Sequence, residues 1–244
     1  MNAPAMNALA MNAAVADRTP SASHAPGTAL FMGLPFPPQA DVLAPRAETE
    51  LLARTALAAI EARAGTVRVV DMCCGSGNVA IALAHHAPRA RVAACDLTAG
   101  AVSAARANAE RLGVADRVEV LRGDLFAPLA GRWLEGRVDL VVCNPPYIST
   151  GRLAGDRAHL VEREPREAFD GGPYGISILQ RLAREAIPFL APGGVLAFEF
   201  GHGQERQVTR LLERAAAYDD IRLVADETGA PRVARARRRE GDAV

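Results

Sequence analysis

The chain has 244 residues, half of them apolar, and its 28 basic residues balance 28 acidic ones. This length is enough for one sizeable domain and too short for two full ones. Binding to duplex DNA requires a basic face, which a chain without net positive charge does not predict. No apolar run reaches the length of a membrane span. We therefore expect no nucleic-acid or membrane partner, while the oligomeric state stays open.

The amino-terminal segment 1–27 is rich in Ala, Asn, Met, Pro and Ser, which predicts a flexible or weakly helical arm. It lacks the basic start and continuous apolar stretch of a signal peptide, so we expect a cytoplasmic protein. Met6, Leu9 and Ala13 follow one another at helical spacing. One interpretation is a helix that closes as a lid over the pocket in which the substrate that accepts the transferred group binds. The alternative is a flexible tail.

The cysteines do not indicate a metal or redox site. They form no CxxC pair and show no His/Cys spacing typical of zinc. Small semi-apolar residues at strand ends are the simpler interpretation, and no metal is expected. The four positions are Cys73, Cys74, Cys95 and Cys143.

Residues 28–66 are expected to form a β-hairpin and a helix that lead into the main domain. The helical stretch runs through LLARTALAAIEARAG, where Leu51, Leu52 and Thr55 share a face, and Gly65 is a plausible stop.

From residue 67 to 244 short apolar runs alternate with helical patterns of ten to fifteen residues. This alternation predicts right-handed βαβ crossovers and a mostly parallel sheet. The expected fold is α/β and Rossmann-like: seven strands, helices on both faces and a C-terminal antiparallel hairpin. The expected strands are VRVVDM, ARVAACD, RVEVLRGD, VDLVVCNPPY and GGVLAFEFG, and the hairpin lies in IRLVADETGAPRVARAR.

The first of these strands ends in Asp71 and is followed by a glycine turn that contains Gly75 and Gly77. Glycine lets the backbone approach a ligand closely and turn into a helix. The dinucleotide spacing GxGxxG is incomplete because Ala80 replaces its last glycine, and the chain has no lysine for a P-loop. The turn alone fits several nucleotide ligands.

Two further strands also end in aspartate. Asp96 closes the second strand, where a carboxylate can accept hydrogen bonds from both ribose hydroxyls. Asp124 closes the third strand and could accept one from an adenine amine. Either residue alone would fit a turn or helix cap. Together, at successive strand ends beside a glycine turn, they predict an adenosine pocket.

The fourth strand ends in the tetrapeptide Asn144-Pro145-Pro146-Tyr147. Two prolines hold the backbone rigid and remove two donors, but a simple turn needs neither the asparagine nor the tyrosine. The Asn144 side-chain oxygen and the Pro145 carbonyl can accept hydrogen bonds from one nitrogen and aim its lone pair. Tyr147 can stack on a planar or cationic neighbour. We interpret these residues as catalytic.

DMCCGSG, ACD, GDLF and NPPY together resemble the class I S-adenosylmethionine-dependent methyltransferases. FMGLPF, PRAETE, EPREAFDGGPYGISIL and FEFGHGQ are similar to the HemK/PrmC family of release-factor glutamine methyltransferases. The resemblance implies S-adenosylmethionine as cofactor, bound by Asp71, Gly75, Gly77, Asp96, Leu97, Asp124, Leu125 and Asn144. It also suggests four substrate-binding candidates: Arg46, Glu50, Glu164 and Tyr174.

The chain departs from the family pattern in three places. Only about 40 residues precede PRAETE, where the family carries a helical docking domain; Cys73 replaces a motif glycine; and Tyr174 replaces an acid. These departures favour a small-molecule amine or amide as the N-methylation acceptor. A release-factor glutamine remains an alternative. A third possibility is that the cofactor's own amine attacks its γ-carbon, giving azetidine-2-carboxylic acid and methylthioadenosine.

Overall fold

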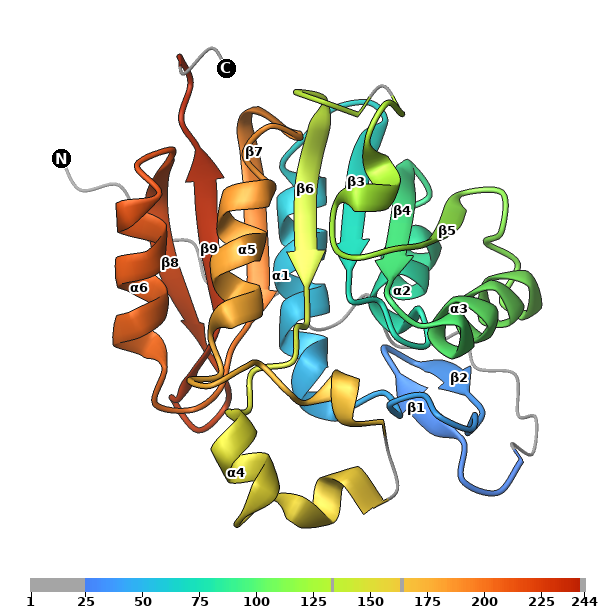
Figure 1. Ribbon diagram of the computed structural model, residues 1–244. Helices are drawn as coiled ribbons and strands as arrows, with labels where there is room; N and C mark the ends of the chain where they lie inside the picture. Colours follow the sequence, from blue (N-terminus) through green and yellow to red (C-terminus); the bar gives the residue numbers. More distant parts are fainter. Residues whose placement is uncertain (1–24, 133, 163–164, 242–244) are drawn as a thin grey trace, which may run out of the picture.

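The computed structural model describes residues 25–132, 134–162 and 165–241. Seven strands form one sheet, in which a single strand near one edge runs antiparallel to both of its neighbours and all other pairings are parallel (Figure 1). The strands of this sheet are β3 (Val67–Met72), β4 (Ala90–Asp96), β5 (Val118–Arg122), β6 (Val138–Cys143), β7 (Leu190–Glu199), β8 (Tyr218–Ala225) and β9 (Pro231–Arg238). The predicted Rossmann-like α/β fold with a C-terminal antiparallel hairpin is therefore confirmed.

The strand order β5-β4-β3-β6-β7-β9-β8 places β3 in the middle of the first five strands, which all pair in parallel. From β3 the chain adds strands outward on one side as far as β5, and then returns to β6 on the other side of β3. The order thus reverses between β3 and β6. Such a reversal leaves a crevice at the carboxyl ends of the two strands, and open α/β sheets bind their ligands there.

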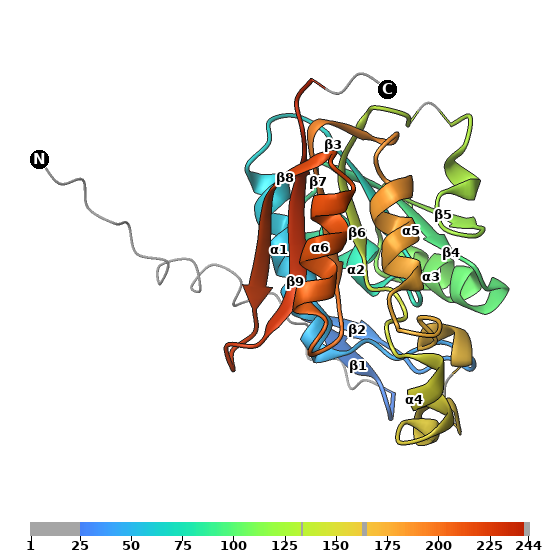
Figure 2. The ribbon, with the colours of Figure 1, turned by 60° about the vertical axis from the view of Figure 1, so that its left-hand side comes forward.

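Helices cover both faces of the sheet (Figure 2). The apolar side chains of α1, α2 and α3 form one core with one face of the strands from β5 to β9, while those of α5 and α6 form the other core against the opposite face, chiefly on β3, β6, β7 and β9. Strands such as β3 bury side chains on both faces, as a sheet between two helical layers requires. The helices are α1 (Glu50–Glu61), α2 (Asn78–His86), α3 (Ala99–Arg111), α5 (Ser177–Glu185) and α6 (Glu205–Arg214).

Two further segments lie at the carboxyl edge of the parallel strands (Figure 1). The hairpin of β1 (Ala29–Phe31) and β2 (Leu34–Phe36) buries Phe31 and Phe36 in the core shared with α1 and α2. Between β6 and α5 the chain forms α4 (Thr150–Ala154) and two 3-10 turns, η4 (Ala158–Glu162) and η5 (Arg166–Ala168). The sequence had not indicated these last three elements, because they are short and carry no clear period.

The last expected helix is shorter than the pattern suggested. The helical pattern of QERQVTRLLERAAAY predicts a helix as far as Tyr218, but α6 ends at Arg214 and Tyr218 begins β8. Tyr218 is buried and its hydroxyl donates a hydrogen bond to the Ala183 carbonyl of α5, at 2.7 Å. This tertiary contact outweighs the local helical preference of the AAAY sequence.

Candidate active site

The turn after β3 takes its shape from two glycines with positive φ. Gly75 has φ +54° and Gly77, the N-cap of α2, has φ +79°. A β-carbon at Gly77 would lie only 3.0 Å from the Ala105 β-carbon of α3, so this position requires glycine for space as well as for conformation. Cys73 adopts φ +56° although it carries a side chain. The turn therefore brings the backbone to the crevice between β3 and β6.

Asp71 lies behind this turn rather than in the crevice. Its side chain is 1% exposed and accepts a hydrogen bond from the Ala80 N–H in the first turn of α2, at 2.9 Å. Burial raises the pKa of Asp71 to about 8, and the charge of nearby Asp96 adds to the rise. Asp71 thus fixes the strand–turn–helix unit, and a direct cofactor contact stays a prediction.

Asp96, at the end of β4, stands at the mouth of the crevice. Its Oδ2 accepts a hydrogen bond from the Gly75 N–H at 3.0 Å, and its Oδ1 accepts two from the N–H and hydroxyl of Thr98. A carboxylate offers about four lone-pair sites, so acceptor capacity remains for a ligand. The same carboxylate therefore ties β4 to the glycine turn and faces the place where a ribose is expected.

The carboxylate of Asp124 has a partner that the sequence did not reveal. Arg181 of α5 donates from Nη1 to both Asp124 oxygens, each at 3.0 Å. Asp124 still borders the crevice, together with Leu97 and Leu125. A bound adenine amine would share this carboxylate with Arg181.

The Asn-Pro-Pro-Tyr segment leaves β6 across the crevice from the glycine turn. The Asn144 amide donates a hydrogen bond from Nδ2 to the Thr49 hydroxyl at 3.0 Å, and Thr49 donates one to Glu199 at 2.8 Å. The Tyr147 hydroxyl donates to the other Glu199 oxygen at 3.0 Å. Tyr147 is therefore anchored inward through its hydroxyl, and stacking of its ring on an acceptor stays a prediction.

A glycine-rich loop packs against the same segment from outside. Gln204 donates hydrogen bonds to the carbonyls of Tyr147 and Gly175, at 3.1 and 3.2 Å. A β-carbon at Gly171 would lie 2.8 Å from the Pro146 carbonyl oxygen, and one at Gly175 would overlap that of Tyr147. The GGPYG loop therefore needs its glycines for close contact with Asn-Pro-Pro-Tyr.

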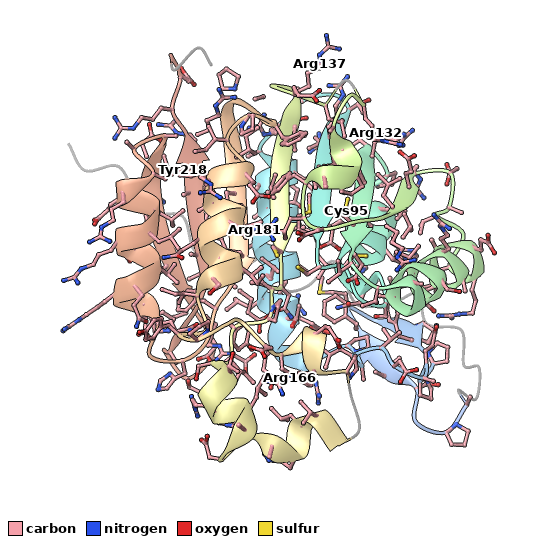
Figure 3. All side chains as sticks on the ribbon, viewed as in Figure 1. Cys95, Arg132, Arg137, Arg166, Arg181 and Tyr218 are labelled. Atoms are coloured by element: carbon pink, nitrogen blue, oxygen red, sulfur yellow. The ribbon has the colours of Figure 1, made fainter. Side chains whose placement is uncertain are left out.

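A cavity of about 430 Å³ lies at the crevice, a size typical of small-ligand sites. Both halves of the site line it: Gly75, Asp96 and Asp124 on one side, Asn144 and Pro146 on the other. Among the side chains labelled in Figure 3, Cys95 and Arg166 line this cavity, and Arg181 holds Asp124. Among the described residues that line it, Asp41, Asp96, Asp124, Glu167 and Asp170 are acidic, and Arg166 is the one basic residue.

These residues fit S-adenosylmethionine. An acidic cavity suits a ligand that carries a sulfonium and an ammonium group, Asp96 offers carboxylate oxygens to a ribose, and the glycine turn admits close approach. Within the described residues, no cluster of His, Cys, Asp and Glu could hold a metal ion. In the same part of the chain, no helix has the length and apolar character to span a membrane.

The four substrate-binding candidates do not gather at this cavity. The Glu50 carboxylate accepts a hydrogen bond from the Met32 N–H at 2.7 Å and pairs with Arg54, so it ties the hairpin to α1. Tyr174 is 80% exposed. Glu50, Tyr174 and Arg46 do not line the cavity. Glu164 lies outside the described residues, as do residues 1–24 of the arm 1–27 for which a lid was predicted. A role in substrate binding stays a prediction for all four.

Fold and site together define a class I S-adenosylmethionine-dependent methyltransferase. The family model of the methyltransferase small domain matches residues 48–173. A release factor glutamine methyltransferase of Moorella thermoacetica is 40% identical over 210 residues, which are 86% of this chain and 72% of the relative. The chain belongs to the methyltransferase small domain family and, within it, to the HemK/PrmC-like enzymes.

Two further relatives widen the comparison. A 4-amino-L-phenylalanine/4-methylamino-L-phenylalanine methyltransferase of Streptomyces pristinaespiralis is 41% identical over 190 residues, covering 76% of this chain and 63% of the relative. The crystal structure of a ribosomal protein L11 methylase from Lactobacillus delbrueckii subsp. bulgaricus superposes with a TM-score of 0.55 at 20% identity, covering 80% of each chain. At that identity the structural likeness shows the fold alone.

The sequence reasoning missed Thr49, Glu199 and Gln204, which hold Asn-Pro-Pro-Tyr in place. One signal could have identified Glu199. It is a carboxylate inside the apolar strand VLAFEF, and a charge in such a strand needs partners when it is buried. Thr49 lies 150 residues away in the sequence and gave no comparable signal.

Proposed function

We propose that this methyltransferase transfers a methyl group to a planar, N–H-bearing nitrogen held at Asn144, and that the side-chain amide of a protein glutamine is the first acceptor to test. One observation carries the proposal: Asn144 lines the same cavity as Asp96 and Asp124, so an acceptor at Asn144 would meet the cofactor within one cavity. The relationship to release factor glutamine methyltransferases supports glutamine as the acceptor.

The residues of the chain position and desolvate the acceptor. The Asn144 Oδ1 and the Pro145 carbonyl oxygen accept hydrogen bonds from the two N–H groups of a primary amide or amine. This arrangement aims the nitrogen lone pair across the crevice. Bound S-adenosylmethionine supplies an electrophilic methyl group on its sulfonium. The nitrogen–methyl bond forms as the sulfur–methyl bond breaks, the electron pair stays on sulfur, and the nitrogen gives one proton to solvent. Positioning and exclusion of water supply the acceleration.

A small aromatic amine is the second candidate acceptor. The Streptomyces relative, which by its name acts on 4-amino-L-phenylalanine, shows that a chain 41% identical to this one can serve a small molecule. An aniline nitrogen has the same two N–H bonds and planar surroundings as a carboxamide. The expected small-molecule acceptor therefore remains part of the proposal.

The cavity also leaves the intramolecular reaction open. Because Asn144 and the cofactor-binding strand ends share one cavity, the cofactor's own amine could occupy the acceptor position. Attack on the γ-carbon would close a four-membered ring and release methylthioadenosine instead of S-adenosylhomocysteine. The two reactions therefore differ in the nucleoside that they produce.

One assay compares the three possibilities. The protein is incubated with S-adenosylmethionine alone, with a bacterial release factor, and with 4-amino-L-phenylalanine, and nucleoside products are separated by chromatography. We expect S-adenosylhomocysteine only when an acceptor is present, with Asn144→Ala as the inactive control. Methylthioadenosine formed at a comparable rate in all three samples would refute methyl transfer and support cyclisation.

A further inference from the structure

Glu199 is a buried carboxylate beside the active-site cavity. It lies at the end of β7, is 3% exposed, and does not line the cavity itself. Its two oxygens accept hydrogen bonds from different hydroxyls, Thr49 on Oε2 and Tyr147 on Oε1. A buried charge is costly unless it is paired and hydrogen-bonded, so this arrangement calls for a functional or structural reason.

With its carboxylate ionised, Glu199 dictates the direction of both hydroxyl hydrogen bonds that it receives. It can only accept, so the Thr49 hydroxyl must point its proton at Glu199. The Thr49 oxygen then has only lone pairs to offer to Asn144, and the Asn144 atom that faces it must be the NH₂ group, as observed at 3.0 Å. An amide has two ends that are nearly identical in shape, and here the Glu199 charge distinguishes them.

The opposite end of the Asn144 amide is left for a ligand. Among the described residues, none donates a hydrogen bond to its Oδ1, and Asn144 lines the cavity. If the amide were turned by 180°, its NH₂ group would face the N–H groups of the acceptor. Both groups are hydrogen-bond donors, so no hydrogen bond could form between them. The direction of the amide therefore decides whether Asn144 attracts or repels an acceptor nitrogen.

Arg232 of β9 supports the charge of Glu199. Its Nη2 lies 3.8 Å from the Glu199 Oε1 and 3.4 Å from the Tyr147 hydroxyl. Burial raises the pKa of Glu199, while the bonds from Thr49 and Tyr147 and the charge of Arg232 oppose that rise. The two hydroxyl donors and the guanidinium group thus reduce the cost of burying the ionised form, which can only accept.

We propose that Glu199 and Thr49 are positioning residues, which act as a relay that fixes the Asn144 amide with its oxygen toward the acceptor nitrogen. This inference rests on the proposed N-methylation for its effect on rate, but the orientation itself is independent of the reaction. It also restricts the acceptor to nitrogens that carry N–H bonds. A tertiary amine has no N–H to donate to the exposed oxygen and is expected not to react.

The kinetic experiment uses variants at both relay positions. Thr49→Val keeps the shape but removes the hydroxyl, and Glu199→Gln introduces a donor that allows the Thr49 hydroxyl to reverse. We expect each to lower kcat about tenfold to a hundredfold, the worth of one oriented hydrogen bond to the reacting group, while the Kd for S-adenosylmethionine stays within about twofold. Thr49→Ser should recover at least a third of the wild-type kcat.

Two controls separate the relay from general damage. Thr55→Val makes the same change on α1, where the Thr55 hydroxyl donates a hydrogen bond to the Leu51 carbonyl in its own helix, and should leave kcat unchanged. The double variant Thr49→Val with Glu199→Gln should be no slower than the slower single variant, because both break one relay. Additive losses, or a slow Thr49→Ser variant, would overturn the relay.

A second readout does not depend on turnover. In an ¹⁵N-labelled protein, the side-chain NH₂ signals of Asn144, assigned by their loss in Asn144→Asp, should exchange slowly with solvent in wild type and Thr49→Ser but at least tenfold faster in Thr49→Val and Glu199→Gln. Unchanged Asn144 exchange in Thr49→Val would overturn the inference. Failure of the proposed function appears differently, as a wild-type protein that methylates no nitrogen.

Discussion

Replacing Asp71 with asparagine should change how the stability of the protein depends on pH. Asp71 is fully buried, and its pKa in the folded protein is about 8 against an ordinary 3.8. Asparagine has the same shape and keeps an oxygen for the Ala80 N–H, but it does not titrate. The pair of proteins therefore isolates the proton on Asp71.

The sign follows from which state holds the proton. Between pH 4 and 8 the unfolded chain has lost the Asp71 proton and the folded protein has kept it, so unfolding releases a proton and stability falls as pH rises. The fall is about 1.4 kcal/mol per pH unit. From an ordinary 3.8 to about 8 this amounts to on the order of 5 kcal/mol, a large part of the 5–15 kcal/mol typical of a domain.

Urea unfolding of both proteins without cofactor, at pH 5, 6, 7 and 8, measures this difference. The free energy of unfolding of wild type should fall relative to Asp71→Asn by about 1.4 kcal/mol for each pH unit up to pH 7 and level off near pH 8. Other titrating groups are common to both proteins and cancel. Curves that stay parallel over the whole range would show that Asp71 is ionised in the folded state, and the burial argument would be wrong.

Three further substitutions test the site. Asp96→Ala should weaken S-adenosylmethionine binding about tenfold to a hundredfold, since a hydrogen bond to a charged group is worth about 1.5–3 kcal/mol; unchanged calorimetric affinity would place the ribose elsewhere. Asn144→Ala should abolish turnover with cofactor affinity nearly intact, and rapid turnover of the variant would remove Asn144 from the reaction. Gly77→Ala should destabilise by about 2–4 kcal/mol through backbone strain and overpacking against Ala105. Gly113→Ala, which has positive φ but open space, should cost only the strain; equal melting temperatures for the two glycine variants would contradict the packing at Gly77.

Much of the fold follows from local patterns in the sequence. Apolar runs such as VRVVDM, separated by helix-length segments, indicate a parallel sheet between helical layers, and in the structure VRVVDM forms β3, the middle one of the five parallel strands. Asp96 and Asn144 stand directly after such runs, so their meeting at one edge could be predicted. The short elements between β6 and α5 could not, because 3-10 turns carry no periodic signal.

The parts of the site that escaped prediction depend on contacts between distant segments. Thr49 belongs to the turn before α1, Glu199 to β7 and Gln204 to the start of α6, and each is an isolated polar residue in its own segment. Only the folded sheet shows that they converge on Asn-Pro-Pro-Tyr. The pairing of Asp124 with Arg181 is of the same kind, since the two residues lie 57 positions apart.

The fate of the methyl group tests the central claim most directly. The protein is mixed with S-adenosylmethionine carrying a ¹³C-labelled methyl group and a saturating acceptor, in a single turnover, and the carbon spectrum is followed. Transfer to nitrogen at the Asn144 site predicts that the label moves from the sulfonium signal to an N-methyl signal, with one S-adenosylhomocysteine per label transferred. Label that remains on sulfur, as methylthioadenosine, would contradict the claim.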